Sequence, residues 1–292
     1  MPTLAVIDGS LRQEERATVS VFDRGFLFGD SVFEVLRTYG GRPYELGAHL
    51  DRLARSARGM GIPLPIDAPR MAREVERGLA KAGNEESYVR IVLTRGRGPL
   101  HIDPRTASHP TRVIIVSSLL PIPSELYAKG VELTSLRFGR ATDHSRAEGA
   151  KVSAYVSNLL AFWQARESGG YEALMVADDG HVSEGNSSNV FVVKSGEVLT
   201  PPLSLGILPG ITRGLVQRLG TELGIPFREA MLFTHDFERA DEAFLTSSLR
   251  EVVPVVGIDG RRIGDGLPGA TTLRLLEAYR TRTRELTSFV GV

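Results

Sequence analysis

The 292-residue chain contains no cysteine, which excludes disulfide bonds, thiol catalysis and cysteine-ligated metal sites. It also lacks a long hydrophobic run. The longest, VIIVSSLLPIP from Val113, is too short to span a bilayer, and the N-terminus shows no signal-peptide pattern. We therefore expect a cytoplasmic protein that does not associate with membranes.

The chain has no excess of charge of either sign. Its 35 basic and 35 acidic residues balance, and the basic residues are spread along the sequence rather than clustered. The basic patch typical of nucleic-acid-binding proteins is missing, so a small-molecule ligand is the better expectation. Lysine is scarce among the basic residues, which limits the candidates for a reactive amine to Lys81, Lys129, Lys151 and Lys194.

Several catalytic signatures are absent as well. The histidines show no H-x-x-x-H or H-E-x-x-H spacing, so we expect no metal. No G-x-S-x-G, G-x-x-x-x-G-K-[ST] or G-x-G-x-x-G motif occurs, which removes the commonest hydrolase, nucleotide and dinucleotide signatures. The sequence RGRGP indicates only an adaptable loop, in which Arg95 and Arg97 add anion-binding capacity.

Hydrophobic patterns predict a mixed α+β protein. Hairpins are expected around Asp8-Gly9 and Gly40-Gly41. Helical and β-rich patterns predict helices and strands at 48–61, 69–83, 87–96, 111–120, 210–224 and 269–286. The prolines of LLPIPSEL predict a linker at 119–126, which separates a smaller N-terminal domain at 1–118 from a larger C-terminal domain at 127–292.

The stretch AKVSAYVSNLLAFWQ places Lys151 directly ahead of a predicted amphipathic helix. Helical spacing predicts a buried face made of Val152, Tyr155, Val156, Leu159, Leu160 and Trp163. A solvated lysine is the simpler interpretation. However, a cation at the positive end of a helix is mildly unfavourable, which favours an amine that is neutral or bonded as an imine.

Three later motifs are, taken singly, ordinary turns and caps. HVSEGNSSNVFVV has Glu184 ahead of a polar turn, LPGITRGLV places Thr212 at a helix N-terminus that suits a phosphate, and FLTSSLREV ends a strand in hydroxyls. Together with FDRGFLFGDSVFEVLR and HLDRLARSA, they resemble the class IV (fold-type IV) pyridoxal-phosphate enzymes. These are the branched-chain aminotransferases, D-amino-acid aminotransferases and aminodeoxychorismate lyases.

The resemblance covers nearly the whole chain and implies a two-domain, mixed α/β, D-amino-acid-aminotransferase-like fold that binds pyridoxal 5'-phosphate. Lys151 would carry the cofactor as a Schiff base and move the substrate proton, and the C-terminal domain would contain this lysine. Glu184 would keep the pyridine nitrogen protonated, and Tyr155 would donate to the phenolic oxygen. The residues expected around the phosphate are Arg52, Ile211, Thr212, Ser247 and Ser248.

The resemblance divides over the substrate. Tyr88 and Arg90 share one strand face, and they resemble the branched-chain pattern of substrate-binding residues, as do Phe33, Val35 and Arg37 as the remaining expected lining. The D-amino-acid enzymes carry a tyrosine where Phe33 stands and an Arg-x-His loop that GRGPLHIDP does not reproduce. The lyases carry a threonine at Val35. Leu249 and Arg250 would crowd or recharge the carboxylate end of the pocket.

We therefore expect a homodimeric transaminase that moves an amino group from an α-amino acid to a 2-oxo acid, with 2-oxoglutarate as acceptor. Branched-chain L-amino acids rank slightly ahead of D-amino acids or (R)-amines, and an aminodeoxychorismate lyase ranks third. A non-catalytic pyridoxal-phosphate-binding protein would hold the cofactor without converting it. A hydrolase or binding module of another class would hold no such cofactor.

Overall fold

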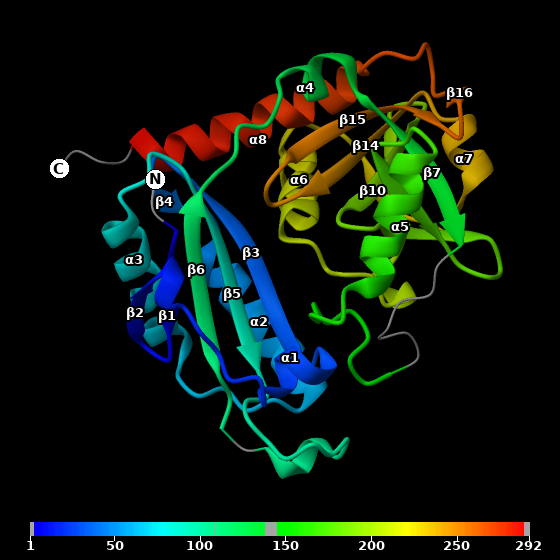
Figure 1. Cartoon of the computed structure of the whole chain (residues 1–292). Helices are drawn as coiled ribbons and strands as arrows, with labels where there is room; N and C mark the ends of the chain where they lie inside the picture. The colour runs from blue at the N-terminus through cyan, green and yellow to red at the C-terminus, as the bar shows by residue number, and fades with distance from the viewer. Residues whose placement is uncertain (1–2, 108, 138–144, 289–292) are drawn as a thin grey trace. The chain divides into compact units, whose positions relative to one another are not determined.

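The computed structural model describes residues 3–107, 109–137 and 145–288 (Figure 1). The chain divides into two compact units. Unit 1 comprises the described residues of Met1–Leu120, His144–Tyr155 and Leu286–Val292, and unit 2 comprises those of Pro121–Asp143 and Val156–Glu285. Each unit has its own sheet and its own hydrophobic core.

The division differs from the predicted domains at one segment. The first crossing from unit 1 to unit 2, after Leu120, falls inside the predicted linker. However, the segment up to Tyr155 returns to unit 1 and takes Lys151 with it, whereas the sequence predicted this lysine in the C-terminal domain. The reason is backbone pairing with a strand of unit 1, described below. The limits at 1–118 and 127–292 stay a prediction.

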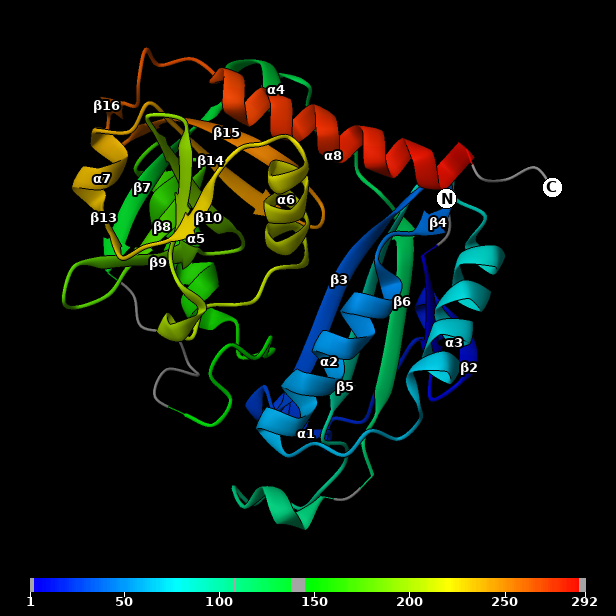
Figure 2. The same cartoon turned by 180° about the vertical axis from the view of Figure 1, so that it is seen from behind.

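Unit 1 is built on an antiparallel sheet. Its strands are β1 (Leu4–Ile7), β2 (Ser10–Gln13), β3 (Ser31–Tyr39), β4 (Arg42–Pro43), β5 (Ser87–Thr94) and β6 (Arg112–Ser118). They form a six-stranded sheet in the order β2-β1-β6-β5-β3-β4. The helices α2 (Leu46–Met60) and α3 (Ala68–Ala82) pack on one face of it over the core (Figure 2). Shorter elements are η1 (Glu14–Arg16), α1 (Arg24–Phe28) and η2 (Pro104–Thr106).

Turns and helix ends in unit 1 follow their local sequence signals. The predicted hairpins at Asp8-Gly9 and Gly40-Gly41 are confirmed as the β1–β2 and β3–β4 pairs. Asp8 and Gly9 have φ of 47° and 83°, the left-handed values that a two-residue hairpin turn requires. α2 and α3 end at Gly61 and Gly83, each with φ of 63°, because glycine adopts this C-terminal conformation at little cost.

Unit 2 is built on a mixed sheet. Its strands are β7 (Val131–Arg137), β8 (Glu172–Val176), β9 (His181–Gly185), β10 (Asn189–Lys194), β11 (Glu197–Thr200), β12 (Phe227–Glu229), β13 (Leu232–Phe233), β14 (Glu242–Ser247), β15 (Glu251–Ile258) and β16 (Arg261–Arg262). They form a 10-stranded sheet in the order β12-β11-β10-β14-β15-β7-β8-β9-β13, and β16 pairs with β15. Parallel pairs join β7 to β8 and β15, and β11 to β12.

The helical elements that begin in unit 2 are α4 (Glu125–Lys129), α5 (Val156–Glu167), η3 (Leu203–Leu205), α6 (Ile211–Glu222), α7 (Thr234–Glu238) and α8 (Ala270–Ser288). Helices and mostly hairpin-connected strands thus occur in both units, and the mixed α/β class expected from the sequence is confirmed. Within the described ranges, no helix combines the length and apolar character that crossing a membrane requires.

The helix after Lys151 buries a different face from the one predicted. The expected buried face is largely exposed, with exposed fractions from 44% to 65% for Val156, Leu159, Leu160 and Trp163. Val152 and Tyr155 precede α5 and are half-buried. The residues that α5 buries are Ala161 and Ala165, which pack against β8. The prediction was wrong because alanines one turn apart let the helix approach the sheet closely, which leaves the bulky side chains outside.

Candidate active site

Lys151 lies on an extended segment that pairs with β3. Its carbonyl accepts a hydrogen bond from the Phe33 N–H at 3.0 Å, and the Ser153 N–H donates to the Ser31 carbonyl at 2.9 Å. The Lys151 N–H donates to Ser56 Oγ of α2 at 3.1 Å. These bonds fix the main chain of the lysine through sheet pairing, not through the first turn of a helix.

The ring of Phe33 is the meeting point of three side chains. Lys151 Nζ lies 4.6 Å from the ring centroid, and the Arg90 guanidinium carbon lies 4.1 Å from it. The Tyr155 ring packs edge-on against Phe33, with 5.6 Å between the centroids. An aromatic face attracts cations through its quadrupole. Lys151 and Tyr155 are thus neighbours through Phe33, and not through the helical spacing on which the sequence argument relied.

The register of β3 and β5 places the expected substrate residues on one sheet face. Directly opposed residues of an antiparallel pair share a face, and the opposed pairs here are Phe33 with Val92, Val35 with Arg90, and Arg37 with Tyr88. Arg37 lies at the far end of this face, where its guanidinium carbon is 4.2 Å from the centroid of the Tyr39 ring. The structure therefore gathers Phe33 and Arg90 near the lysine and leaves Arg37 apart.

On the opposite face of β3, Arg52 of α2 is held by a buried carboxylate. Glu34 accepts from Arg52 Nε and Nη2, each at 2.7 Å, and contacts His49 Nδ1 at 2.7 Å. Burial raises the pKa of Glu34, but the hydrogen bonds and charge of Arg52, followed by those of His49, outweigh it and lower the pKa to about 2. Burial lowers the pKa of His49, so its neutral ring donates from Nδ1.

This cluster predicts that the protein loses stability in acid. The folded pKa of Glu34, about 2, lies below its ordinary 4.5, so its stabilisation is complete above pH 4.5 and lost as the pH falls towards 2. His49 binds a proton more readily when unfolded, so loss begins below its ordinary pKa of 6.5. We expect urea unfolding to show Glu34 contributing about 3 kcal/mol over its range. Equal unfolding free energies at pH 7 and pH 3 would contradict this.

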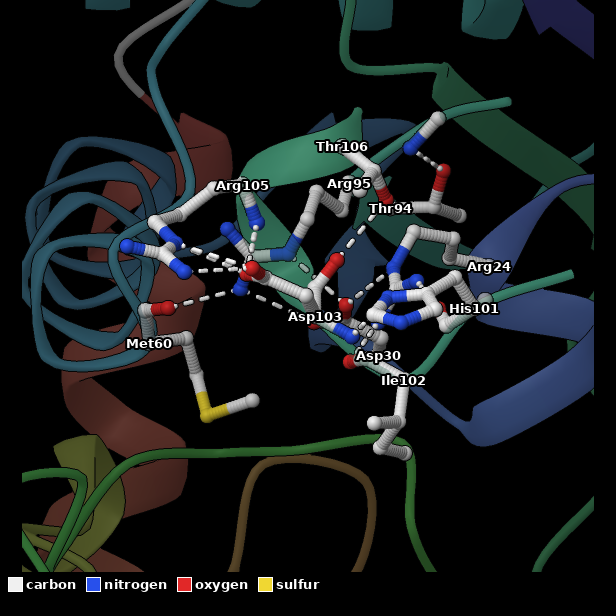
Figure 3. Close-up of polar contacts among 12 residues, drawn as sticks. Arg24, Asp30, Met60, Thr94, Arg95, His101, Ile102, Asp103, Arg105 and Thr106 are labelled. Carbon is white, nitrogen blue, oxygen red and sulfur yellow. Dashed lines mark hydrogen bonds and ion pairs between the residues drawn. The ribbon is translucent and has the colours of Figure 1, made fainter. Parts of the chain in front are cut away.

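A second buried network in unit 1 fixes the loop after β5 (Figure 3). Asp30 accepts from Arg24 Nε at 2.9 Å and from Arg95 Nε and Nη2 at 2.7 and 3.0 Å. Arg24 also donates to the carbonyls of His101 and Ile102 at 2.6 and 2.9 Å. Arg95 donates to two carbonyls at the end of α2. The expectation that Arg95 adds anion-binding capacity is wrong, because its guanidinium is committed to these internal acceptors.

In unit 2, Glu184 and the approach to α6 are tied to the same residue. The Leu208 N–H donates to Glu184 Oε2 at 3.2 Å, and the Leu208 carbonyl accepts from Asn189 Nδ2 at 3.0 Å. Leu208 lies shortly before the first residue of α6. The strand β9, the strand β10 and the start of α6 therefore hold Glu184 and this helix terminus in one arrangement.

The first turn of α6 has the character of an anion site. Its N-cap is Gly210, for which the described residues provide no side-chain cap. A Cβ added at Gly210 would lie 1.9 Å from Asn189 Oδ1, so glycine is required by the close approach. Without a capping side chain, the N–H groups of Ile211 and the buried Thr212 are directed at the helix terminus, where they suit a phosphate.

Arg250 links the β14–β15 turn to the turn after Glu184. It donates to Glu172 Oε2 at 2.7 Å, to Ser187 Oγ at 2.8 Å and to Ser247 Oγ at 3.1 Å. Burial lowers the pKa of Arg250, but the charge of Glu172 outweighs it and raises the pKa above its ordinary value. Arg250 was expected to recharge the substrate pocket. Its charge is instead compensated by Glu172, which is 0% exposed.

These side chains fit the cofactor implied by the resemblance. Unit 1 offers an amine beside an aromatic ring and a guanidinium. Unit 2 offers a carboxylate, a helix terminus and the hydroxyl of Ser247, with Ser248 and Leu249 in the same turn. Sequence reasoning missed the partners that hold them: Glu34, His49, Glu172, Asn189 and Asp30. The available signal was a charge within an apolar strand, as for Glu34 in SVFEVLR and Glu172 in EALMV.

Comparison with known proteins agrees with this arrangement. Residues 31–258 match the family model described as Amino-transferase class IV. The chain is 38% identical over 274 residues to a putative branched-chain-amino-acid aminotransferase of Methanocaldococcus jannaschii, with 94% of each chain covered. It is 31% identical over 279 residues to the D-alanine aminotransferase of Bacillus licheniformis, covering 94% of this chain and 95% of that one.

A solved structure shows the same fold. A branched-chain amino acid aminotransferase from T.th., complexed with N-(5'-phosphopyridoxyl)-L-glutamate, matches with a TM-score of 0.89 at 28% identity, covering 97% of this chain and 94% of that chain. The fold-type IV architecture expected from the sequence is therefore confirmed, as is the enzyme class. This chain belongs to the class IV aminotransferase family.

Proposed function

We propose that this enzyme is a pyridoxal-phosphate-dependent transaminase that moves an amino group from an α-amino acid to a 2-oxo acid. Branched-chain L-amino acids are the favoured donors and 2-oxoglutarate the expected acceptor. The observation that carries the proposal is the cluster at Phe33, where the amine of Lys151 and the guanidinium of Arg90 lie over one ring. The similarity to a relative complexed with a phosphopyridoxyl-glutamate compound supports it.

The residues expected for the chemistry have distinct tasks. When bound, pyridoxal phosphate supplies an electron sink that stabilises negative charge at the substrate Cα. The amine of Lys151 would bind the cofactor and, once released, take the proton from the substrate Cα. The carboxylate of Glu184 would hold a proton at the pyridine nitrogen. The hydroxyl of Tyr155 would donate to the phenolic oxygen.

The residues expected for phosphate binding supply both charge and N–H groups. In unit 2, the first turn of α6 would contribute the N–H groups of Ile211 and Thr212, and the β14–β15 turn would contribute Ser247 and Ser248. In unit 1, Arg52 would contribute a guanidinium. Glu34 accepts from its Nε and Nη2, which fixes the plane of that guanidinium.

The substrate would lie on the face of β3 and β5 that carries Phe33. Arg90 provides a cation for the carboxylate, with Tyr88 on the same face. Phe33 and Val35 provide apolar surface that suits an aliphatic side chain. These residues support branched-chain donors, while the likeness to a D-alanine aminotransferase keeps D-amino acids as the second candidate.

The test is a panel of L- and D-amino acids added to the purified holoenzyme, with the visible absorbance of the lysine-bound cofactor as readout. We expect L-leucine, L-isoleucine and L-valine to remove this absorbance, and 2-oxoglutarate to restore it. Conversion by D-amino acids or (R)-amines alone would contradict the donor proposed. Loss of pyruvate from aminodeoxychorismate would indicate the lyase. Binding without any conversion would indicate a non-catalytic cofactor-binding protein.

The proposal includes a homodimer, as the resemblance implies. The exposed apolar side chains of α5, Val156, Leu159, Leu160 and Trp163, support this. Large exposed apolar patches are typical of protein–protein interfaces. The cytoplasmic location expected from the sequence stays a prediction.

A further inference from the structure

The hydroxyl of Ser247 has an unusually well-defined role as an acceptor. It accepts from the Arg250 side-chain Nε at 3.1 Å and from the Arg250 backbone N–H at 3.3 Å. A hydroxyl group has two acceptor lone pairs and a single O–H donor. Because both lone pairs face Arg250, the O–H is left to donate to a third group, and a phosphate oxygen is such an acceptor.

Arg250 is itself fixed in place. Its Nη1 donates to Glu172 at 2.7 Å and its Nη2 donates to Ser187 Oγ at 2.8 Å. The other oxygen of Glu172 accepts from the Ser187 N–H, the Ser187 hydroxyl and the Ser188 hydroxyl at 2.7, 3.1 and 2.8 Å. The planar guanidinium therefore joins two turns through one buried carboxylate. Its charge is matched by that of Glu172 and is not left for a substrate carboxylate.

We propose that Arg250, paired with Glu172, is a positioning residue for the cofactor's phosphate. By donating twice to Ser247 it directs the serine O–H towards the phosphate, and by binding Ser187 it holds this hydroxyl in register with the turn that follows Glu184. Arg250 thus acts in cofactor binding and not in reading the substrate's carboxylate. This inference rests on the proposed function, because it requires pyridoxal phosphate as the ligand.

The test compares the dissociation constants of pyridoxal phosphate and of pyridoxal, which lacks the phosphate. In Arg250→Met we expect the dissociation constant for pyridoxal phosphate to rise about ten- to a hundredfold, the size of a hydrogen bond to a charged group. The constant for pyridoxal should change far less. Ser247→Ala should show the same selective loss, and adding Arg250→Met to it should bring little further change, since both act through one hydroxyl.

Two further variants complete the design. Arg280→Met removes a neighbouring ion pair of unit 2, between Arg280 and Glu251 at 2.8 Å, and should leave the ratio of the two constants unchanged. Arg250→Lys keeps a charge beside Glu172 but has no Nε–H, so it should fold and still lose the preference for the phosphate. It replaces Arg250→Met if that variant does not fold.

The outcomes separate the two claims. An unchanged ratio in both Arg250 variants, with a raised KM for the amino acid, would overturn the inference and make Arg250 a substrate residue. A wild-type protein that binds neither compound would overturn the proposed function itself.

Discussion

Replacing Lys151 with alanine is expected to lower the rate of amino transfer by at least about a thousandfold, because a positioned base is worth about 10²–10⁴ in rate and the covalent attachment of the cofactor is lost as well. The fold should survive. Only the main chain of Lys151 takes part in the pairing with β3 and in the bond to Ser56, and alanine retains both.

The measurement is the single-turnover rate with an L-amino acid donor, together with the visible spectrum and the thermal unfolding midpoint. Lys194→Ala is the matched control, because it removes a lysine of unit 2 that bonds Asp236 at 2.7 Å. The control should keep the spectrum and the rate. A Lys151→Ala variant within tenfold of the wild-type rate would contradict the role proposed for this lysine.

Replacing Glu34 with glutamine is expected to destabilise the protein by about 3–5 kcal/mol, the typical cost of leaving a buried charge without its partner. Glutamine has the same size, so the loss would come from the charge of Arg52 and not from a cavity. Glu34 and Arg52 are 0% and 3% exposed, so little water reaches the pair. Because Arg52 would also lose its orientation, the affinity for pyridoxal phosphate should fall.

Urea unfolding of the apoprotein at neutral pH measures this effect. Asp103→Asn is the control within unit 1, since it breaks the exposed pair with Arg105 and should change the unfolding free energy little. In Glu34→Gln the acid-dependent loss between pH 4.5 and pH 2 should also disappear. An unfolding free energy equal to that of the wild type would show that the buried pair does not stabilise unit 1.

The features that the sequence predicted best depend on neighbouring residues. The hairpin at Asp8-Gly9 and the glycine ends of α2 and α3 follow from backbone conformations that few residues adopt. The face buried by α5 could not be read in the same way. Periodicity shows which side chains align along a helix, but the surface on which the helix packs decides whether bulky residues or alanines such as Ala161 turn inwards.

The candidate site divides along the same line. Resemblance identified the residues expected to touch the cofactor, but not the residues that hold them. Glu172 is separated from Arg250 by 78 residues, and Glu34 from Arg52 by 18, so no local pattern links them. Lys151 was expected to depend on the following helix. Its dependence on β3 arises from a strand pairing that only the folded chain displays.

The central claim is that Lys151 carries the cofactor and releases it to an amino acid. Borohydride reduction of the holoenzyme, followed by peptide mass mapping, tests this most directly, because reduction fixes the cofactor to the lysine that holds it. The predicted result is a phosphopyridoxyl group on Lys151 alone, which disappears when an L-amino acid donor is added before the reductant. A label on Lys81, Lys129 or Lys194, or a label on Lys151 that no amino donor removes, would contradict the account.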